Sequence, residues 1–417
     1  MIVANNSLTK IRRGIRQLWY RDIWHFWPSA PLNWRYFLPT QSAAIRMHRQ
    51  LWWHSRYKLP GLLWLPMELV RWIYWRLWVA HRLVSKAVAS NGPEVAERFG
   101  ISTDMQRQQL AFWAKAWCID PYTAYNWQLF RPDANGLAII YENQTSAFHA
   151  MQNRKTGATK ADHRLLGDKI KLAEKLSALG VPMVTTAIIS SGDWQDVLSA
   201  LHLQARVFCK LRSGNQGESA FAVWQGEQGL SGQALTGKQL PDEAVLKQAW
   251  QTLSAKGAVL IQPLLENHAA LSSASEDGSA ITLRVVTRIG SGGINVWFAE
   301  LHIPGKFEEG NSRGFWRIAV SILKGELFSF PKHSFLKKAW QDENDGCLQQ
   351  LATLERLPFW SEICRHSISA HHELPKVWAI AWDWVITPNG PVLLEGNGGW
   401  GLDTPQVQLG GFGEKFS

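Results

Sequence analysis

The sequence predicts an α+β fold with more than one domain, and three observations support this prediction. The chain has 417 residues, which is more than one hydrophobic core usually serves. Its composition, 46% hydrophobic and 19% charged residues, allows enough burial to offset the entropy of ordering the chain. From about residue 160 helix-like segments alternate with strand-like ones, and the strand-like segments late in the chain favour antiparallel pairing.

The first hundred residues carry the excess positive charge of the chain. They hold 15 Lys and Arg against 4 Asp and Glu, whereas the remaining 317 residues hold 29 against 30. They also contain 10 of the 24 tryptophans. Arg beside Trp and Tyr suits a membrane interface or a partner surface, yet it also suits a helical extension whose tryptophans pack on the rest of the protein. Both interpretations stay open, and nucleic-acid binding is not expected because no recognition motif accompanies the charge.

Neither a membrane-spanning helix nor a cleaved signal peptide is expected in this basic head. A span needs ~20 nearly uncharged residues, and the most apolar stretch, residues 59–84, is interrupted by prolines and charges. On an ideal helical projection Glu68, Arg71 and Arg82 share one arc and Arg76 lies elsewhere, so the amphipathic pattern is imperfect. The interrupting residues are Pro60, Pro66, Glu68, Arg71, Arg76 and Arg82.

Local patterns predict the elements that follow the head. Residues 92–127 are expected to be helical, with GPEVAERFG at the N-terminal boundary. A helix over residues 168–179 should end at Gly180, before a β-rich run at residues 181–189. A further helix is expected from Trp194. Strands are predicted at residues 206–211, 258–265, 280–289, 294–303, 377–386 and 391–396.

The last two strands form a predicted hairpin around the turn TPNGP. If the turn centres on Asn389, Asp383 lies opposite Glu395, and alternation places Asn397 on the same face as Glu395. Trp382 and Trp384 then point the other way. Two like charges that face each other require a cation between them, and hard oxygen donors of this kind suit Mg²⁺. A solvated acidic hairpin end is the structural alternative.

A second candidate motif is VFCKLRSGNQGESAF, in which a strand delivers Lys210 directly before a glycine-containing turn. Glycine lets backbone N–H groups approach a phosphate, and a lysine adds a compact positive charge. The motif is neither a Walker A loop nor GxGxxG, and a plain turn after a strand would look similar. Arg284, on the apolar strand TLRVVT, is either an ion-pair partner or a catalytic cation.

Taken in order, four blocks of the chain resemble the ATP-grasp fold and, more narrowly, the sugar-transfer-associated ATP-grasp family. The resemblance covers roughly residues 120–417. The blocks are LLGDKIKLAEKLSALGVPMVTT, VFCKLRSGNQGESAF, VLIQPLLENHAALSS leading into AITLRVVTRI, and AIAWDWVITPNGPVLLEGNGGWGLDTPQ. The fold implied is two α+β lobes that grip ATP, preceded by the helical, Trp- and Arg-rich N-terminal extension. The domains expected are an extension at 1–90, a helical linker at 91–160, an N-terminal lobe at 161–265 and a C-terminal lobe at 266–417.

The resemblance implies a role for individual positions. Lys169 and Lys210 resemble the two lysines that reach the nucleotide phosphates, and Arg284 resembles the arginine that faces the phosphates and the transition state. The hinge strand at 259–265 would read the adenine edge, and one of Glu266, Asn267 and His268 would contact the ribose. The cofactor-binding residues implied are Lys169, Lys210, Ser213, Gly214, Gln216, Gly217, Gln262, Leu264, Leu265 and His268; the catalytic residues are Arg284 and Lys210; the metal ligands are Asp383, Glu395 and Asn397.

One stretch departs from the family pattern. Where relatives tend to show an acidic-Asn pair and a double glycine, this chain has EEGNSRGFWRIAV at residues 308–320. No role is therefore assigned to Asn311 or Arg313.

The activity implied is that of an ATP-dependent carboxylate-amine ligase that works through an acyl phosphate, with ATP and two Mg²⁺ ions, or Mn²⁺ in their place. The partner is a carboxylate-bearing small molecule or glycoconjugate, in polysaccharide or glycoconjugate synthesis. A phosphotransferase of the same fold and a non-catalytic, membrane-associated scaffold are the alternatives. The four cysteines lie far apart, without zinc or disulfide spacing, which favours a reducing, cytoplasmic location, with the head as a candidate for contact with the inner face of the membrane.

Overall fold

A computed structural model of the chain describes residues 33–55, 61–213, 219–227, 229–275, 277–305, 315–328, 351, 354–413 and 415–416. The chain divides into two compact units. The N-terminal unit runs to Ala147 and also takes in the residues from Leu409 onward, and the second unit lies between Phe148 and Gln408. The four domains expected from the sequence, with the three boundaries between them, stay a prediction.

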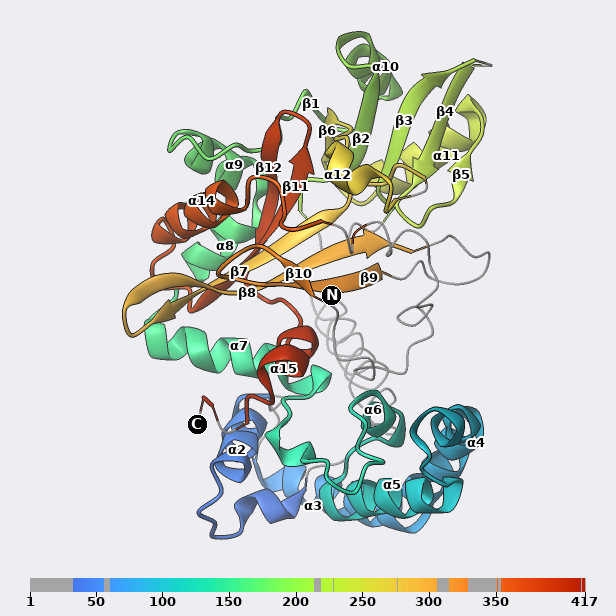
Figure 1. Cartoon of the computed structure of the whole chain (residues 1–417), viewed down its shortest axis with the longest axis vertical. Coiled ribbons are helices and arrows are strands. Elements are labelled where there is room, and N and C mark those ends of the chain that lie inside the picture. Colours follow the sequence, from blue (N-terminus) through green and yellow to red (C-terminus); the bar gives the residue numbers. More distant parts are fainter. Residues whose placement is uncertain are drawn as a thin grey trace, which may run out of the picture. The chain divides into compact units, whose positions relative to one another are not determined.

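The described residues of the N-terminal unit form helices (Figure 1). They pack around a core that includes Trp75, Leu110, Trp113 and Phe130, and the indole N–H of Trp75 donates to the carbonyl of Ala114 at 2.8 Å. The helices are η2 (Trp34–Phe37), α2 (Ala43–Ser55), α3 (Gly61–Tyr74), the π-helical η3 (Trp75–Val79), α4 (Ala80–Phe99), α5 (Thr103–Trp117), α6 (Pro121–Asn126), η4 (Gly136–Ala138) and α7 (Glu142–Thr156), which continues into the second unit. In the described part of the chain no helix combines the length and the apolar composition needed to cross a membrane.

Two expectations about this unit are wrong. The segment GPEVAERFG does not begin a helix, because α4 starts at Ala80 and runs through Pro93 to its left-handed cap at Gly100, with φ of +67°. Burial of Val88 and Val95 in the core holds the helix together across the proline. The ideal projection also fails, because the π-helical turn η3 inserts a residue. Arg82 is therefore exposed, whereas Glu68 and Arg71 are buried and paired with each other.

The second unit is built on two sheets, and the strands late in the chain pair antiparallel, as their patterns predict. The first has the order β1-β6-β2-β3-β4-β5 and the second β10-β9-β8-β7-β11-β12 (Figure 1). The first sheet consists of β1 (Ile188–Ser190), β2 (Arg206–Leu211), β3 (Phe221–Gly226), β4 (Gly229–Ala234), β5 (Gln239–Leu240) and β6 (Val259–Pro263). The second consists of β7 (Thr282–Gly290), β8 (Gly293–Pro304), β9 (Phe315–Val320), β10 (Leu327–Phe328), β11 (Ala379–Thr387) and β12 (Gly390–Asn397).

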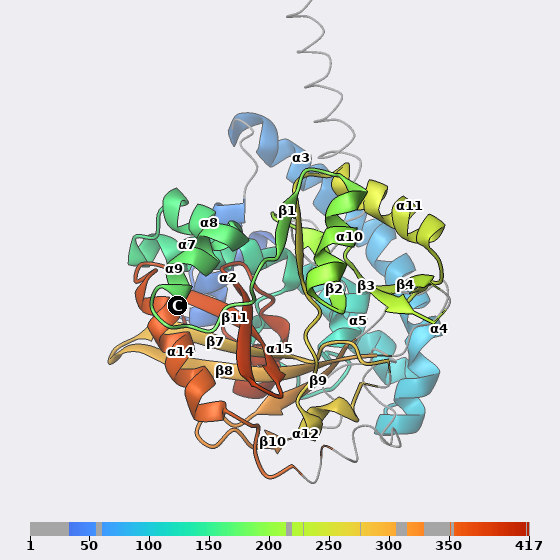
Figure 2. The ribbon, with the colours of Figure 1, turned by 90° about the horizontal axis from the view of Figure 1, so that it is seen from above.

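Helices pack on one face of each sheet. On the first sheet α10 and α11 bury Val207 and Cys209 of β2, so the neighbouring residue Lys210 points to the other face. On the second sheet α14 contacts β7, β8 and β11 (Figure 2) and packs over Trp382 and Trp384. The helices of this unit are α8 (Lys160–Gly167), α9 (Lys169–Ser177), α10 (Trp194–Leu203), α11 (Glu243–Ser254), α12 (Ala269–Ser272), α14 (Trp360–His372) and α15 (Asp403–Leu409).

The predicted β-rich run at residues 181–189 is a strand only at its end. Its first part lies along β12, where Leu393 donates to the carbonyl of Pro182 at 2.8 Å and Val184 donates back to Leu393 at 3.0 Å. Ala187 then donates to Ile261 of β6, at the start of β1. The segment passes from the second sheet to the first, so it cannot pair continuously with either one.

Two buried histidines, His149 and His371, make hydrogen bonds that stabilise the second unit. His371 donates from Nε2 to the carbonyl of Val377 at 2.8 Å and accepts at Nδ1 from Thr287 at 2.7 Å. The hydroxyl of Thr287 in turn accepts from the indole N–H of Trp382 at 2.8 Å. His149 accepts from Trp378 and donates to the carbonyl of Trp400. Each ring has one donor and one acceptor role, so each must stay neutral.

We expect these histidines to make the protein sensitive to acid. Burial lowers the pKa of both His149 and His371 to about 4, against 6.5 in the unfolded chain. Their contribution is therefore complete above pH 6.5 and is lost as the pH falls toward 4, at a cost of about 2 kcal/mol each at pH 5. Urea unfolding at pH 7 and pH 5 measures this difference. His149→Gln and His371→Gln should each flatten the pH dependence, and an unchanged dependence in both variants would contradict the assignment.

Candidate functional site

The C-terminal hairpin has the predicted pairing, but a β-bulge produces it. The loop is Pro388-Asn389, so Thr387 pairs with Gly390 and Trp384 with Leu393. Continued without interruption, that register would place Asp383 opposite Leu394. The register shifts between Asp383 and Trp384, which leaves Leu394 as the extra residue and brings Asp383 opposite Glu395. The expected cross-strand pair is confirmed.

A row of four charged side chains crosses adjacent strands on the face that α14 does not cover. The backbone register places Glu395 of β12 opposite Asp383 of β11, and Asp383 opposite Arg284 of β7. Arg284 in turn lies opposite Glu300 of β8. The guanidinium of Arg284 grips Asp383 with two hydrogen bonds, Nε to Oδ1 at 2.7 Å and Nη2 to Oδ2 at 2.8 Å. Burial by itself would lower the pKa of Arg284, but Asp383, Glu300 and Glu395 outweigh burial and raise it.

Two cationic side chains, one for each carboxylate, supply the positive charge expected beside Asp383 and Glu395. Arg284 holds Asp383, and Lys169 lies 3.3 Å from Oε2 of Glu395. Asn397 donates from Nδ2 to Oδ2 of Asp383 at 3.0 Å and to Oε1 of Glu395 at 3.2 Å. The structure therefore brings together the three predicted metal ligands and two of the predicted phosphate-binding cations.

Lys169 is positioned by the first turn of α9. Asp168 caps this helix by accepting from the backbone N–H groups of Ile170 and Lys171. Its carboxylate also binds the guanidinium of Arg212, at the end of β2, at 2.9 Å, and Arg212 holds the pKa of Asp168 below its ordinary value. One carboxylate thus links the lysine-bearing helix to the strand that carries Lys210.

Lys210 faces the same carboxylates from the first sheet. Its pKa is lowered to about 8, chiefly because burial disfavours the cation. Glu395 and Asp383 oppose this effect and Lys169 adds to it, so all four groups lie within electrostatic reach of one another. Two lysines and two carboxylates from three separate blocks of the sequence therefore converge.

The structure describes only some of the other residues that were predicted to contact the nucleotide. Gly214, Gln216 and Gly217 lie outside the described residues, and Ser213, which precedes them, is exposed. Gln262 is buried and donates to the hydroxyl of Thr186 at 3.0 Å.

Several residues in and after the predicted hinge strand already make hydrogen bonds within the protein. The N–H of Leu264 donates to the carbonyl of Arg206 at 3.0 Å, so it would have to exchange that bond for one to adenine, and Leu265 beside it is partly exposed. Of the three ribose candidates, Asn267 is held by Ser279 and Ile281 and His268 caps α12, whereas Glu266 is exposed.

The oxygen donors at the hairpin fit a magnesium ion. Among the residues that the structure describes, no three His, Cys, Asp or Glu side chains gather as a metal site, so the amide of Asn397 must serve as the third donor. Rotation of that amide by half a turn would present Oδ1 where Nδ2 now faces both carboxylates. Two carboxylates and an amide oxygen are hard donors of the kind that Mg²⁺ prefers.

Glu300 is the member of the charged row that the sequence analysis missed. It is 3% exposed and lies 2.7 Å from Nε2 of His302. Burial would raise its pKa, but His302, Arg317 and Arg284 together lower it to about 2. The available signal was a single acidic residue inside the apolar strand INVWFAELHI, which requires a buried partner.

Gly396 lies between Glu395 and Asn397, two of the predicted metal ligands. A substitution at this glycine therefore tests the geometry of the site. An added Cβ would lie 2.6 Å from the ring of Trp382 and 3.1 Å from Leu166. We expect Gly396→Ala to lower the free energy of unfolding by about 1–3 kcal/mol and to weaken ATP binding, because the clash displaces the strand that carries Glu395. Urea unfolding and calorimetry with ATP and Mg²⁺ measure both effects. Gly399→Ala, where the Cβ meets open space, is the matched control and should change neither.

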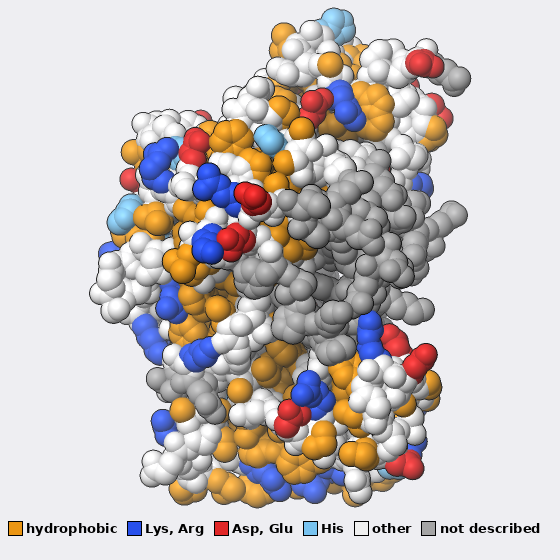
Figure 3. All heavy atoms as spheres, viewed as in Figure 1, with side chains coloured by type: hydrophobic (Ala, Val, Ile, Leu, Met, Phe, Trp, Pro, Cys, Tyr) orange, Lys and Arg blue, Asp and Glu red, His pale blue; other side chains and the backbone are white. Residues whose placement is uncertain are grey.

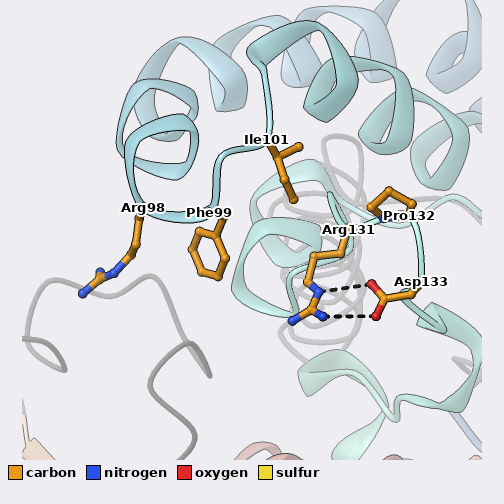
Figure 4. Close-up of a pocket in the computed structure, with 6 residues that line it drawn as sticks. All are labelled: Arg98, Phe99, Ile101, Arg131, Pro132 and Asp133. Carbon is orange, nitrogen blue, oxygen red and sulfur yellow. Dashed lines mark hydrogen bonds and ion pairs between the residues drawn. The ribbon is translucent and has the colours of Figure 1, made fainter.

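The N-terminal unit contains a pocket, and the residues that line it are far in the sequence from those of the candidate site. It has a volume of about 410 Å³ and is lined by Arg98, Phe99, Ile101, Arg131, Pro132 and Asp133 (Figure 4). Arg131 binds Asp133 through two hydrogen bonds of 3.1 Å, and Arg98 lies 3.7 Å from Glu94. Both guanidinium groups of this pocket therefore lie near carboxylates of the same unit.

Two α+β lobes, with cations from one facing carboxylates on the other, are the architecture of an ATP-grasp protein. The chain belongs to the sugar-transfer associated ATP-grasp family, whose model matches residues 159–412. A comparison with curated proteins found no match.

Several solved structures resemble the chain at low identity. The ATP-grasp ligase PsnB with its minimal precursor is 12% identical over 64% of this chain and 69% of its own, with a TM-score of 0.35. The VanG D-Ala:D-Ser ligase from Enterococcus faecalis is 11% identical over 62% and 61%, with a TM-score of 0.37. Biotin carboxylase from Campylobacter jejuni is 11% identical over 64% and 48%, with a TM-score of 0.38. The match thus spans less than two thirds of the length of the last two proteins.

Proposed function

We propose that the protein is an ATP-dependent ligase that joins a carboxylate to an amine or a related nucleophile through an acyl phosphate. The observation that carries this proposal is the convergence of Lys169, Lys210 and Arg284 on the carboxylates of Asp383 and Glu395. Phosphoryl transfer needs mainly positioning and charge neutralisation, which this set supplies. Membership of the ATP-grasp family supports ATP as the nucleotide.

Each residue has a distinct task in this proposal. Lys169 and Lys210 hold the phosphate oxygens of ATP, and Arg284 neutralises the γ-phosphoryl group as it leaves ADP for the carboxylate oxygen. Asp383, Glu395 and Asn397 hold Mg²⁺, as two ions or with Mn²⁺ in their place. A metal held by these residues would offset the negative charge of the phosphate oxygens.

The second half-reaction completes the balance of atoms. The nucleophile attacks the carbonyl carbon of the acyl phosphate, the C–O bond to phosphate breaks, and inorganic phosphate leaves as the amide forms. The amine gives up one proton in this step. Phosphate and ADP are thus the products that every substrate pair must release.

The substrate class follows from the family's association with sugar transfer. We assign the acceptor to a carboxylate-bearing small molecule or glycoconjugate of cytoplasmic polysaccharide or glycoconjugate synthesis. The description of the family supports this assignment by analogy of fold.

A screen for ADP release over pairs of carboxylates and amines, with purified protein, ATP and Mg²⁺, tests the proposal. Release of ADP and phosphate together with a condensation product is the expected result. ADP with a stable phosphorylated product and no condensation would show a phosphotransferase instead. Glu395→Ala should abolish turnover, and unaltered biological activity in that variant would identify a non-catalytic scaffold.

A further inference from the structure

An apolar stripe lies exposed on the N-terminal unit. Its members recur with helical spacing along α3 and η3, and each is between 38% and 60% exposed, whereas single apolar residues scattered over a surface are ordinary. The stripe consists of Leu69, Val70, Ile73, Tyr74, Leu77 and Trp78.

The fold keeps these side chains on one face. Trp75, Ala80 and Val84 point into the core of the unit, and the five-residue step from Trp75 to Ala80 is the π-helical turn. A π-helical turn contains more residues than an α-helical turn, so it changes the angular position of the residues that follow it. The exposed residues of α4 therefore lie on the same side of the helix as the stripe. The apolar face is therefore a consequence of packing on the opposite side.

The exposed charged residues along the stripe and the first part of α4 are basic. Glu68 is the one acidic residue between positions 61 and 93, and it is 5% exposed and paired with Arg71. The stripe leads directly into the exposed His81, Arg82 and Lys86 of α4. Figure 3 shows hydrophobic side chains next to Lys and Arg side chains on the N-terminal unit, where Asp and Glu side chains are also visible.

We propose that this stripe docks on an anionic lipid surface, with the apolar side chains at the level of the acyl boundary and the basic residues against the headgroups. Charge complementarity selects this occupant. A second copy would bring two basic faces together, and the chain's own residues 1–32 are also basic, with one Lys and four Arg against one Asp. Tyr and Trp beside aliphatic residues are typical of the membrane interface. The proposal does not depend on the enzymatic function.

Sedimentation of the full-length protein with vesicles of phosphatidylcholine and phosphatidylglycerol at 7:3 tests the proposal. The double variant Leu77→Glu/Trp78→Glu should reduce the partition coefficient by at least about tenfold, because it places two carboxylates at an anionic surface. Leu203→Glu is the matched control: this leucine of α10 is 70% exposed but lies in the second unit, so its variant should bind like the wild type. Thermal unfolding by circular dichroism confirms that all the proteins are folded.

Two further measurements separate the occupants. Arg82→Glu/Lys86→Glu should also weaken binding to anionic vesicles, and pure phosphatidylcholine should bind the wild type about tenfold less. Equal binding of wild type and stripe variants would overturn the proposal. A dimer in solution that the stripe variants dissociate, with vesicle binding unchanged, would assign the face to self-association. Loss of binding on deletion of residues 1–32 alone, with the stripe variants unaffected, would overturn it as well.

Discussion

Arg284→Met should lower ATP turnover by about a thousandfold and destabilise the second unit at the same time. The arginine is the expected partner of the transferring phosphoryl group, and loss of such a residue costs about 10³-fold or more in kcat. It also holds Asp383, which is 6% exposed, through two hydrogen bonds. Removal of one partner of a buried ion pair costs about 3–5 kcal/mol of unfolding free energy. ADP release and urea unfolding measure the two effects separately.

A double variant distinguishes the catalytic from the structural role of this pair. Arg284→Met/Asp383→Leu removes both charges, so stability should return to within about 1–2 kcal/mol of the wild type. Turnover should stay lost, because the double variant restores neither the proposed phosphoryl-binding cation nor the proposed metal ligand. Recovery of turnover in the double variant would mean that the pair serves the fold alone. Arg284→Lys keeps one charge without the two-pronged geometry and should fall between these cases.

The hairpin shows how far the sequence could predict the site. Alternation and turn position were enough to place Asp383 opposite Glu395 and Asn397 beside them, and the structure has this pairing. The prediction assumed a turn centred on Asn389, whereas the true loop is Pro388-Asn389 and a bulge at Leu394 restores the register. Nothing local in VLLEGN announces a bulge, because the extra residue is fixed by the packing of both strands.

The sequence patterns could not predict contacts between segments that lie far apart in the chain. The partnership of Asp168 with Arg212 joins a helix cap to a strand end, and Glu300 lies in the charged row because β8 pairs with β7. Both depend on long-range pairing that single-strand periodicity does not contain. The same reason explains the 181–189 segment, whose propensity is that of a strand although it crosses between two sheets.

ATP affinity should fall by about tenfold for each pH unit above pH 8, and Lys210 should be the cause. Burial lowers the pKa of this lysine to about 8. Below that pH the side chain is already cationic, so in the proposed role it would bind phosphate oxygens without taking up a proton. Above it, binding must first take up a proton, so the apparent affinity declines until the pH reaches the higher pKa of Lys210 in the complex.

Lys210→Arg and Lys210→Met make this pH prediction specific to one residue. The arginine variant stays charged and should lose the break at pH 8, while the methionine variant should bind weakly at every pH. Lys175→Met, at an exposed lysine that pairs with Glu373, should retain the break and serves as the control. Calorimetry in buffers of different ionisation enthalpy should show uptake of nearly one proton at pH 9 in the wild type and in the control. Proton uptake that persists in Lys210→Arg would assign the titration to another group, and Lys210 would then not be the residue that meets the phosphates.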